Sequence, residues 1–142
     1  MGIISKLKEF FEKKPNEFES LKELEKELTV LKKNTNSMII ALIGIGGRLK
    51  GLPLIYDATD ENILKRYAAK INELINPIKT LANDKVLDDF IINFKDSIIL
   101  CKMITDNIGF LGFTRFSNDI ELIQQWFFKN KKMLMKLFEE KE

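Results

Sequence analysis

The most constraining feature of this 142-residue chain is an apolar run over 38–45, MIIALIGI, with a cluster of glycines at and beyond its end. The run is too short to cross a membrane, and its isoleucine content is typical of a strand that is covered on both faces. The glycines precede a second apolar segment over 52–56: Gly44, Gly46, Gly47 and Gly51. Because glycine permits positive φ and close backbone approach, the sequence predicts a hairpin at the centre of a sheet.

The same glycines raise the alternative of a phosphate-binding loop. The P-loop needs Gly-Lys followed by Ser or Thr at the start of a helix, and the dinucleotide pattern needs a third glycine where Leu49 stands. A strand is expected to follow here, so a hairpin turn is favoured. Asp57, Asp60 and Glu61 lie at the end of that strand, where they could hold a hard metal ion or cap the next helix, and capping is favoured.

Composition narrows the classes of function. The chain has no histidine and a single cysteine, Cys101, so it cannot form an intramolecular disulfide, and Ser-His and Cys-His hydrolase mechanisms are disfavoured. Its 23 basic and 21 acidic residues give a net charge of +2 without a concentrated basic patch, so nucleic acid is not an expected partner. We therefore expect no catalytic residues, no cofactor and no metal, in a cytoplasmic protein with a buried, unreactive thiol.

Residues 1–15 are predicted to form an accessory amphipathic helix ahead of the main domain. Its apolar face carries Ile4, Leu7 and Phe11, and Pro15 ends it. This face is a candidate for binding a partner or, together with nearby lysines, an anionic membrane surface. Packing on its own domain or on a dimer mate is the favoured alternative.

Residues 16–142 are predicted to form one α+β domain. Hydrophobic periodicity places helices over 16–33, 61–82 and 118–138, and strands over 38–45, 52–56, 86–95, 97–104 and 110–116. Pro77 is expected to kink the second of these helices or to begin a separate final turn, and Asn118 to cap the third. Trp126, Phe127 and Phe128 are expected in the core. The result is a five-stranded antiparallel sheet with helices on both faces, in the order α-αββαβββα.

Several residues within this order match a known pattern. They are Gly51-Leu52-Pro53-Leu54-Ile55 at the second strand, Ala68 and Ala69 in the central helix, and the closing strands Ile98-Ile99-Leu100 and Phe110-Leu111-Gly112. On these residues the chain from about Ser20 onward resembles the roadblock/dynein light-chain family. The longin fold uses the same elements in a permuted order, and the helix before the first strand favours roadblock.

The resemblance implies a non-catalytic dimer that scaffolds or regulates a small Ras-like GTPase. In that family sheets join edge to edge and central helices lie side by side, in homodimers or in dimers with a paralogous roadblock protein. The sequence itself gives partial support to a dimer, since an unpaired edge strand seldom carries alternating large apolar side chains such as those predicted for the strand over 86–95. The predicted dimer interface consists of Tyr67, Ile71, Leu74, Phe90, Ile92 and Phe94.

Other interpretations remain open from the sequence. The N-terminal helix could cover the excess apolar surface within a monomer. The domain could also be a longin-type adaptor or a sensor that binds a small ligand in its core.

Overall fold

A computed structural model describes residues 15–83 and 85–138, with side chains from Leu21 onward. The predicted accessory helix, with Ile4, Leu7 and Phe11, lies outside this description. The elements are α2 (Pro15–Asn34), β1 (Ile39–Gly44), a short 3-10 turn η1 (Gly47–Leu49), β2 (Pro53–Ala58), α3 (Glu61–Leu81), β3 (Asp89–Asn93), β4 (Ile98–Met103), β5 (Ile108–Thr114) and α4 (Ser117–Leu137). The predicted order αββαβββα is confirmed.

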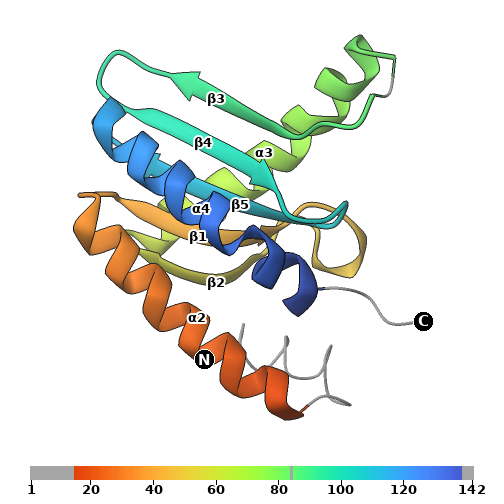
Figure 1. Cartoon of the computed structure of the whole chain (residues 1–142). Coiled ribbons are helices and arrows are strands. Elements are labelled where there is room, and N and C mark those ends of the chain that lie inside the picture. Colours follow the sequence, from red (N-terminus) through yellow and green to blue (C-terminus); the bar gives the residue numbers. More distant parts are fainter. Residues whose placement is uncertain (1–14, 84, 139–142) are drawn as a thin grey trace.

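The five strands form one antiparallel sheet in the order β2-β1-β5-β4-β3 (Figure 1). Its central strand is β5, which pairs with both β1 and β4. The prediction that the whole 38–56 hairpin lies at the centre is therefore wrong for its second strand, because β2 forms one edge of the sheet. The strand β3 forms the other edge.

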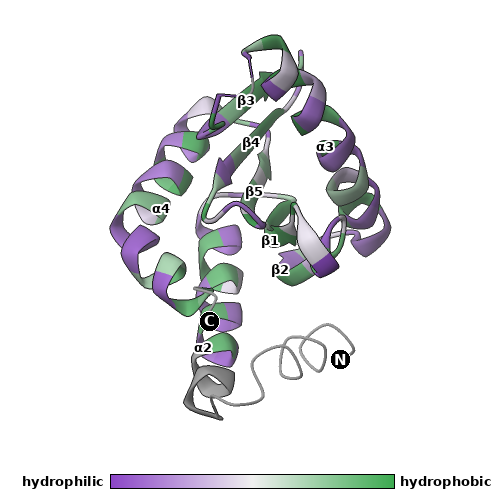
Figure 2. Ribbon diagram, turned by 90° about the vertical axis from the view of Figure 1, so that its right-hand side faces the viewer, coloured by the Kyte–Doolittle hydropathy of each residue, from purple (hydrophilic) through white to green (hydrophobic). Residues whose placement is uncertain are grey.

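Helices cover both faces of the sheet, as predicted (Figure 2). On one face, α2 and α4 bury their apolar stripes, including Leu24, Leu28, Ile123 and Phe127. On the other face, α3 buries Leu64, Ala68, Ile71 and Ile75 against strand residues that point that way. The fold class is thus α+β, with α2 and α4 on one face of the sheet and α3 on the other.

The glycine-rich segment is a tight turn, as the sequence predicts. Gly47 and Gly51 have φ values of 67° and 79°, which side chains other than glycine rarely adopt. A Cβ on Gly44 would overlap the backbone carbonyl of Leu49. Gly44 N–H donates to Leu52 O (2.8 Å) and its carbonyl accepts from Gly51 N–H (2.9 Å), which closes the turn.

Local predictions at the helices had mixed outcomes. Asp60 caps α3 by accepting from the backbone N–H groups of Asn62 (2.8 Å) and Ile63 (3.4 Å). The alternative of a separate final turn at Pro77 is wrong, since α3 continues through Pro77 to Leu81. The predicted Asn118 cap is wrong because α4 begins at Ser117, with Phe116 at the N-cap position, so Asn118 already lies inside the helix.

The aromatic triplet on α4 is only partly in the core. Phe127 is buried and Trp126 is half-buried, and both rings lie against Phe110, at centroid distances of 5.2 and 5.5 Å. Phe128 is 72% exposed. Three consecutive helix residues span about 200° of arc, so they cannot all face one sheet.

Candidate functional site

The edge strand β3 leaves a row of backbone groups without a partner. Hydrogen bonds from Phe94 N–H to Ser97 O (2.8 Å) and from Met103 N–H to Asp88 O (2.9 Å) set the even-numbered residues toward β4. By the alternation of an antiparallel ladder, the N–H and C=O groups of Asp89, Ile91 and Asn93 point away from β4. In the described part of the chain nothing pairs with them. This edge is open to another strand.

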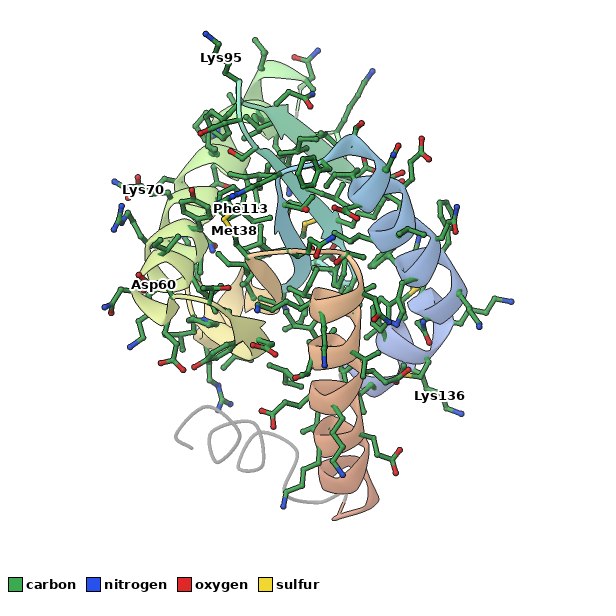
Figure 3. All side chains as sticks on the ribbon, turned by 90° about the vertical axis from the view of Figure 1, so that its left-hand side faces the viewer. Met38, Asp60, Lys70, Lys95, Phe113 and Lys136 are labelled. Atoms are coloured by element: carbon green, nitrogen blue, oxygen red, sulfur yellow. The ribbon has the colours of Figure 1, made fainter. Side chains whose placement is uncertain are left out.

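The α3-facing side of β3 is apolar. Phe90 and Ile92 are half-buried against the core beneath α3, whereas Phe94 is 52% exposed at the end of the strand, close to the turn that carries Lys95 (Figure 3). On the opposite side of the same strand Ile91 is 44% exposed. A bare edge with apolar side chains on both faces is a favourable surface for association.

The predicted helix residues differ in how much surface they present. Ile71 is buried against the sheet of its own chain, so it has little surface left for a second copy. Leu74 is exposed, and Tyr67 is half-buried with its ring edge-to-face on Phe113 (5.1 Å). Figure 3 shows Phe113 between α3 and the sheet, beside Met38.

An apolar row joins α3 to the open edge. In the strand register Phe113 lies opposite Ile99, and Ile99 lies opposite Ile92. All three side chains face α3, so Tyr67, Phe113, Ile99 and Ile92 follow one another across the sheet. This apolar row therefore connects the predicted interface residues of α3 with those of the edge strand.

Within this apolar row Phe113 and Ile99 are buried, whereas Tyr67 and Ile92 at its two ends are only half-buried. The two faces of the sheet carry different numbers of helices. On one face, α2 approaches β1 and β2 while α4 approaches β4 and β5. On the other face α3 alone approaches β1 and β2. The β4–β3 side of the α3 face thus lacks a second helix within the described chain.

One contact at this edge was not predicted from the sequence. Lys102, on β4, pairs its Nζ with Asp89 Oδ2 at 3.1 Å and lies over the rings of Phe127 (5.7 Å) and Phe128 (5.6 Å). The lysine side chain is largely buried, and the contact ties the edge strand to α4. The only sequence signal was a lysine inside an otherwise apolar strand.

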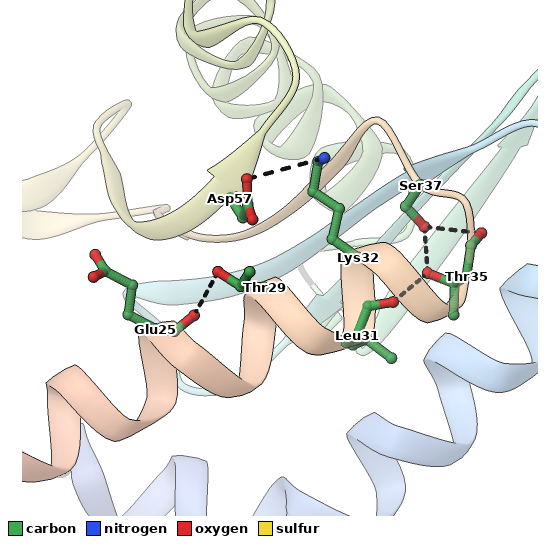
Figure 4. Close-up of polar contacts among 7 residues, drawn as sticks. All are labelled: Glu25, Thr29, Leu31, Lys32, Thr35, Ser37 and Asp57. Atoms are coloured by element: carbon green, nitrogen blue, oxygen red, sulfur yellow. Dashed lines mark hydrogen bonds and ion pairs between the residues drawn. The ribbon is translucent and has the colours of Figure 1, made fainter.

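The carboxylates considered for metal binding have separate partners. Asp57 lies 4.0 Å from Lys32 of α2 (Figure 4), Asp60 caps α3, and Glu61 accepts from the Tyr56 hydroxyl at 3.2 Å. Burial, and then the nearby Glu61 charge, raise the pKa of Tyr56. Among the residues that the structure describes, no group of three or more acidic, cysteine or histidine side chains is placed to hold a metal ion.

Two further features bear on chemistry. Cys101 is a free, buried thiol on β4, and burial, with a smaller effect of Asp89, raises its pKa from 9.0 to about 12. A thiol with that pKa is a poor nucleophile near neutral pH. No helix within the described ranges has the length and apolar character needed to cross a membrane.

Comparison with known proteins identifies the fold. No family model and no curated protein matches the chain. Among solved structures, the gliding protein MglB from Thermus thermophilus is 12% identical over 80% of this chain and 87% of its own, with a TM-score of 0.63. A structure described as MglB with a tetrameric arrangement is 12% identical over 81% and 88% (TM-score 0.62).

A Roadblock/LC7 domain from Streptomyces avermitilis is 10% identical over 70% of this chain and 80% of its own, with a TM-score of 0.55. The protein therefore has the fold of a roadblock/LC7-type domain. At these identities the likeness extends to the fold alone.

Proposed function

We propose that this chain is a non-catalytic scaffold or regulator that works as a dimer joined through β3. The observation that carries the proposal is the apolar row from Tyr67 to Ile92, which ends at an unpaired strand edge. A second copy would add a strand to the edge and place its own α3 beside the first. Both the free backbone groups and the uncovered part of the α3 face would then be buried.

The open backbone groups restrict how two copies can pair. Only Asp89, Ile91 and Asn93 offer outward N–H and C=O groups on β3. A symmetric antiparallel pair uses all of them when Ile91 lies opposite Ile91 of the second copy. In this register Phe90 lies opposite Ile92 of the second copy on the α3 face, which gives apolar cross-strand pairs.

The same register supplies a variant that tests the dimer. Phe94 would lie opposite Asp88 of the second copy, so Phe94→Glu places like charges together without disturbing the core, since the side chain is half exposed. Leu122→Glu, at a similarly exposed apolar residue on α4, is the matched control. We expect sedimentation velocity to give a dimer for the native chain and for Leu122→Glu, and a dissociation constant raised at least tenfold for Phe94→Glu. A monomeric native chain at about 100 µM would refute this part of the proposal.

The partner in this proposal is a small Ras-like GTPase or a related roadblock or longin protein, in the cytoplasm. Its support is the family resemblance of the sequence together with a fold shared with MglB and Roadblock/LC7 structures. Self-association agrees with the tetrameric arrangement described for one MglB structure. The test is affinity capture from the native cytoplasm with GTP analogue and with GDP. Enrichment of a small GTPase supports the proposal, and its absence under both nucleotides contradicts it.

A further inference from the structure

A groove lies at the end of the sheet where β4 turns into β5, between the C-terminal ends of α3 and α4. Its volume is about 790 Å³, and it is open to solvent. Apolar side chains from several elements line it, among them Ile45, Ile75, Met103 and Met135. Val86, before β3, lines it too and is almost fully exposed. The groove is large enough for several side chains of a bound peptide.

Lysines dominate the charge of this groove. Lys79 of α3 and Lys131, Lys132 and Lys136 of α4 line it, against only two aspartates, Asp88 and Asp106. Within residues 15–83 and 85–138, none of the four lysines has an ion pair. Figure 3 shows Lys136 near the end of α4, pointing outward. Among the described residues their positive charges have no ion-pair partner and line the open groove.

Stabilisation of the helix ends accounts for only two of the four lysines that line the groove. Lys79 and Lys136 lie in the last turns of α3 and α4, where a cation interacts favourably with the helix dipole. Lys131 and Lys132 precede the last turn of α4, so this effect does not account for them. Nor does packing, because they are at least partly exposed.

From this combination we infer that the groove docks an acidic amphipathic segment of a partner protein. Apolar side chains of such a segment would lie along the apolar lining, and its carboxylates would meet the lysines. The chain's own residues 1–15 are a poor match because they carry more lysines than glutamates. A lipid surface fits less well than a peptide, since apolar lining residues such as Ile45 and Ile75 are buried in the concave groove and a flat surface cannot reach them.

The inference is independent of the proposed dimer and GTPase. The groove uses neither the outward backbone groups of β3 nor the apolar row beneath α3. Asp88 both lines the groove and lies opposite Phe94 of the second copy in the proposed register, but Val86, Lys131 and Lys132 lie outside that strand pairing. A monomeric protein could therefore bind the acidic segment, and a dimeric protein could fail to bind it.

The test uses the full chain and a fluorescent peptide of about twelve residues with leucines on one helical face and glutamates on the other. Fluorescence anisotropy measures its affinity for the native protein, for Lys131→Glu/Lys132→Glu, and for Val86→Ser. The matched control is Lys26→Glu/Lys33→Glu, which changes the net charge equally at exposed sites on α2. The same peptide with lysines in place of glutamates is the ligand control.

We expect saturable binding of the acidic peptide that weakens with added salt. The Lys131→Glu/Lys132→Glu variant should bind at least tenfold more weakly, and Val86→Ser severalfold more weakly. Lys26→Glu/Lys33→Glu should stay within twofold of the native protein. Equal losses in the two charge variants would overturn the inference, because net charge would then explain binding. So would absence of saturable binding, or binding to phosphatidylserine vesicles without binding to the peptide.

Discussion

Replacement of Gly44 by alanine tests how much the close packing of the glycine turn contributes to the stability of the sheet. Backbone hydrogen bonds join Gly44 N–H to Leu52 O and Gly51 N–H to Gly44 O, and the buried side chain of Asn72 donates Nδ2–H to the same carbonyl at 2.8 Å. A Cβ at this position overlaps the Leu49 carbonyl, so the backbone must move and these contacts must distort. At about 1 kcal/mol for each of the three hydrogen bonds, the loss is about 3 kcal/mol.

Gly51→Ala provides the matched comparison. Gly51 also has positive φ, but a Cβ there meets no atom within 4 Å. Its cost is the strain of a left-handed alanine alone, roughly 1 to 2 kcal/mol. Both variants should still fold, because a domain of this size is stable by about 5 to 15 kcal/mol.

Urea unfolding followed by fluorescence measures the difference. Trp126 is the only tryptophan, and it is half-buried and stacked on Phe110, so its emission should report the loss of the core. Gly44→Ala should reduce the free energy of unfolding by more than Gly51→Ala does. If Gly44→Ala costs no more than Gly51→Ala, close packing at Gly44 does not hold the turn.

Two further predictions concern α3 and the buried thiol. Asp60→Ala removes the side-chain cap of α3 and should lower the free energy of unfolding, measured by heat or urea, by about 1 kcal/mol. Asp60→Asn keeps a capping oxygen and should lower it much less. Equal losses in the two variants would contradict the capping role. Burial raises the pKa of Cys101 to about 12, so the native state keeps a thiol proton that the unfolded chain loses above pH 9. The contribution of the buried neutral thiol to the free energy of unfolding is therefore full below pH 9 and falls as the pH rises from 9 toward 12. Between about pH 8 and pH 10, native protein should therefore lose roughly 1 kcal/mol more than Cys101→Ala, and parallel pH curves for the two proteins would refute this.

The sequence predicted those parts of the fold that follow from local rules. Hydrophobic patterns identified every described α-helix and strand, because each α-helix buries one side and the inner strands β1, β4 and β5 are apolar and buried on both sides. Glycines at positive φ marked the turn, and Asp60 marked the start of α3, because both depend on a few neighbouring residues. The exposed edge at Phe90 to Phe94 was also predicted, although β3 is shorter than expected.

Features that depend on long-range pairing were missed or misplaced. The order of strands across the sheet puts β5 at the centre and β2 at an edge, and no local pattern encodes that choice. Lys102 meets Asp89 and two rings of α4 only after three elements have packed together. Helical spacing placed Ile71 at the predicted interface; that role stays a prediction, and within the single chain Ile71 is buried against the sheet. The groove with its four lysines combines residues of α3, the segment before β3, the β4–β5 turn and α4, which lie far apart in the sequence.

Cross-linking of Ile91→Cys tests the proposed dimer most directly. In a Cys101→Ala background the new thiol is the only one in the chain. In the proposed register the paired Cα atoms lie about 5.5 Å apart, within the range that a disulfide spans. We predict that mild oxidation yields a covalent dimer of Ile91→Cys at micromolar concentration, and none of the control Leu122→Cys. A noncovalent dimer in which Ile91→Cys does not cross-link, or equal cross-linking of both variants, would contradict pairing through β3.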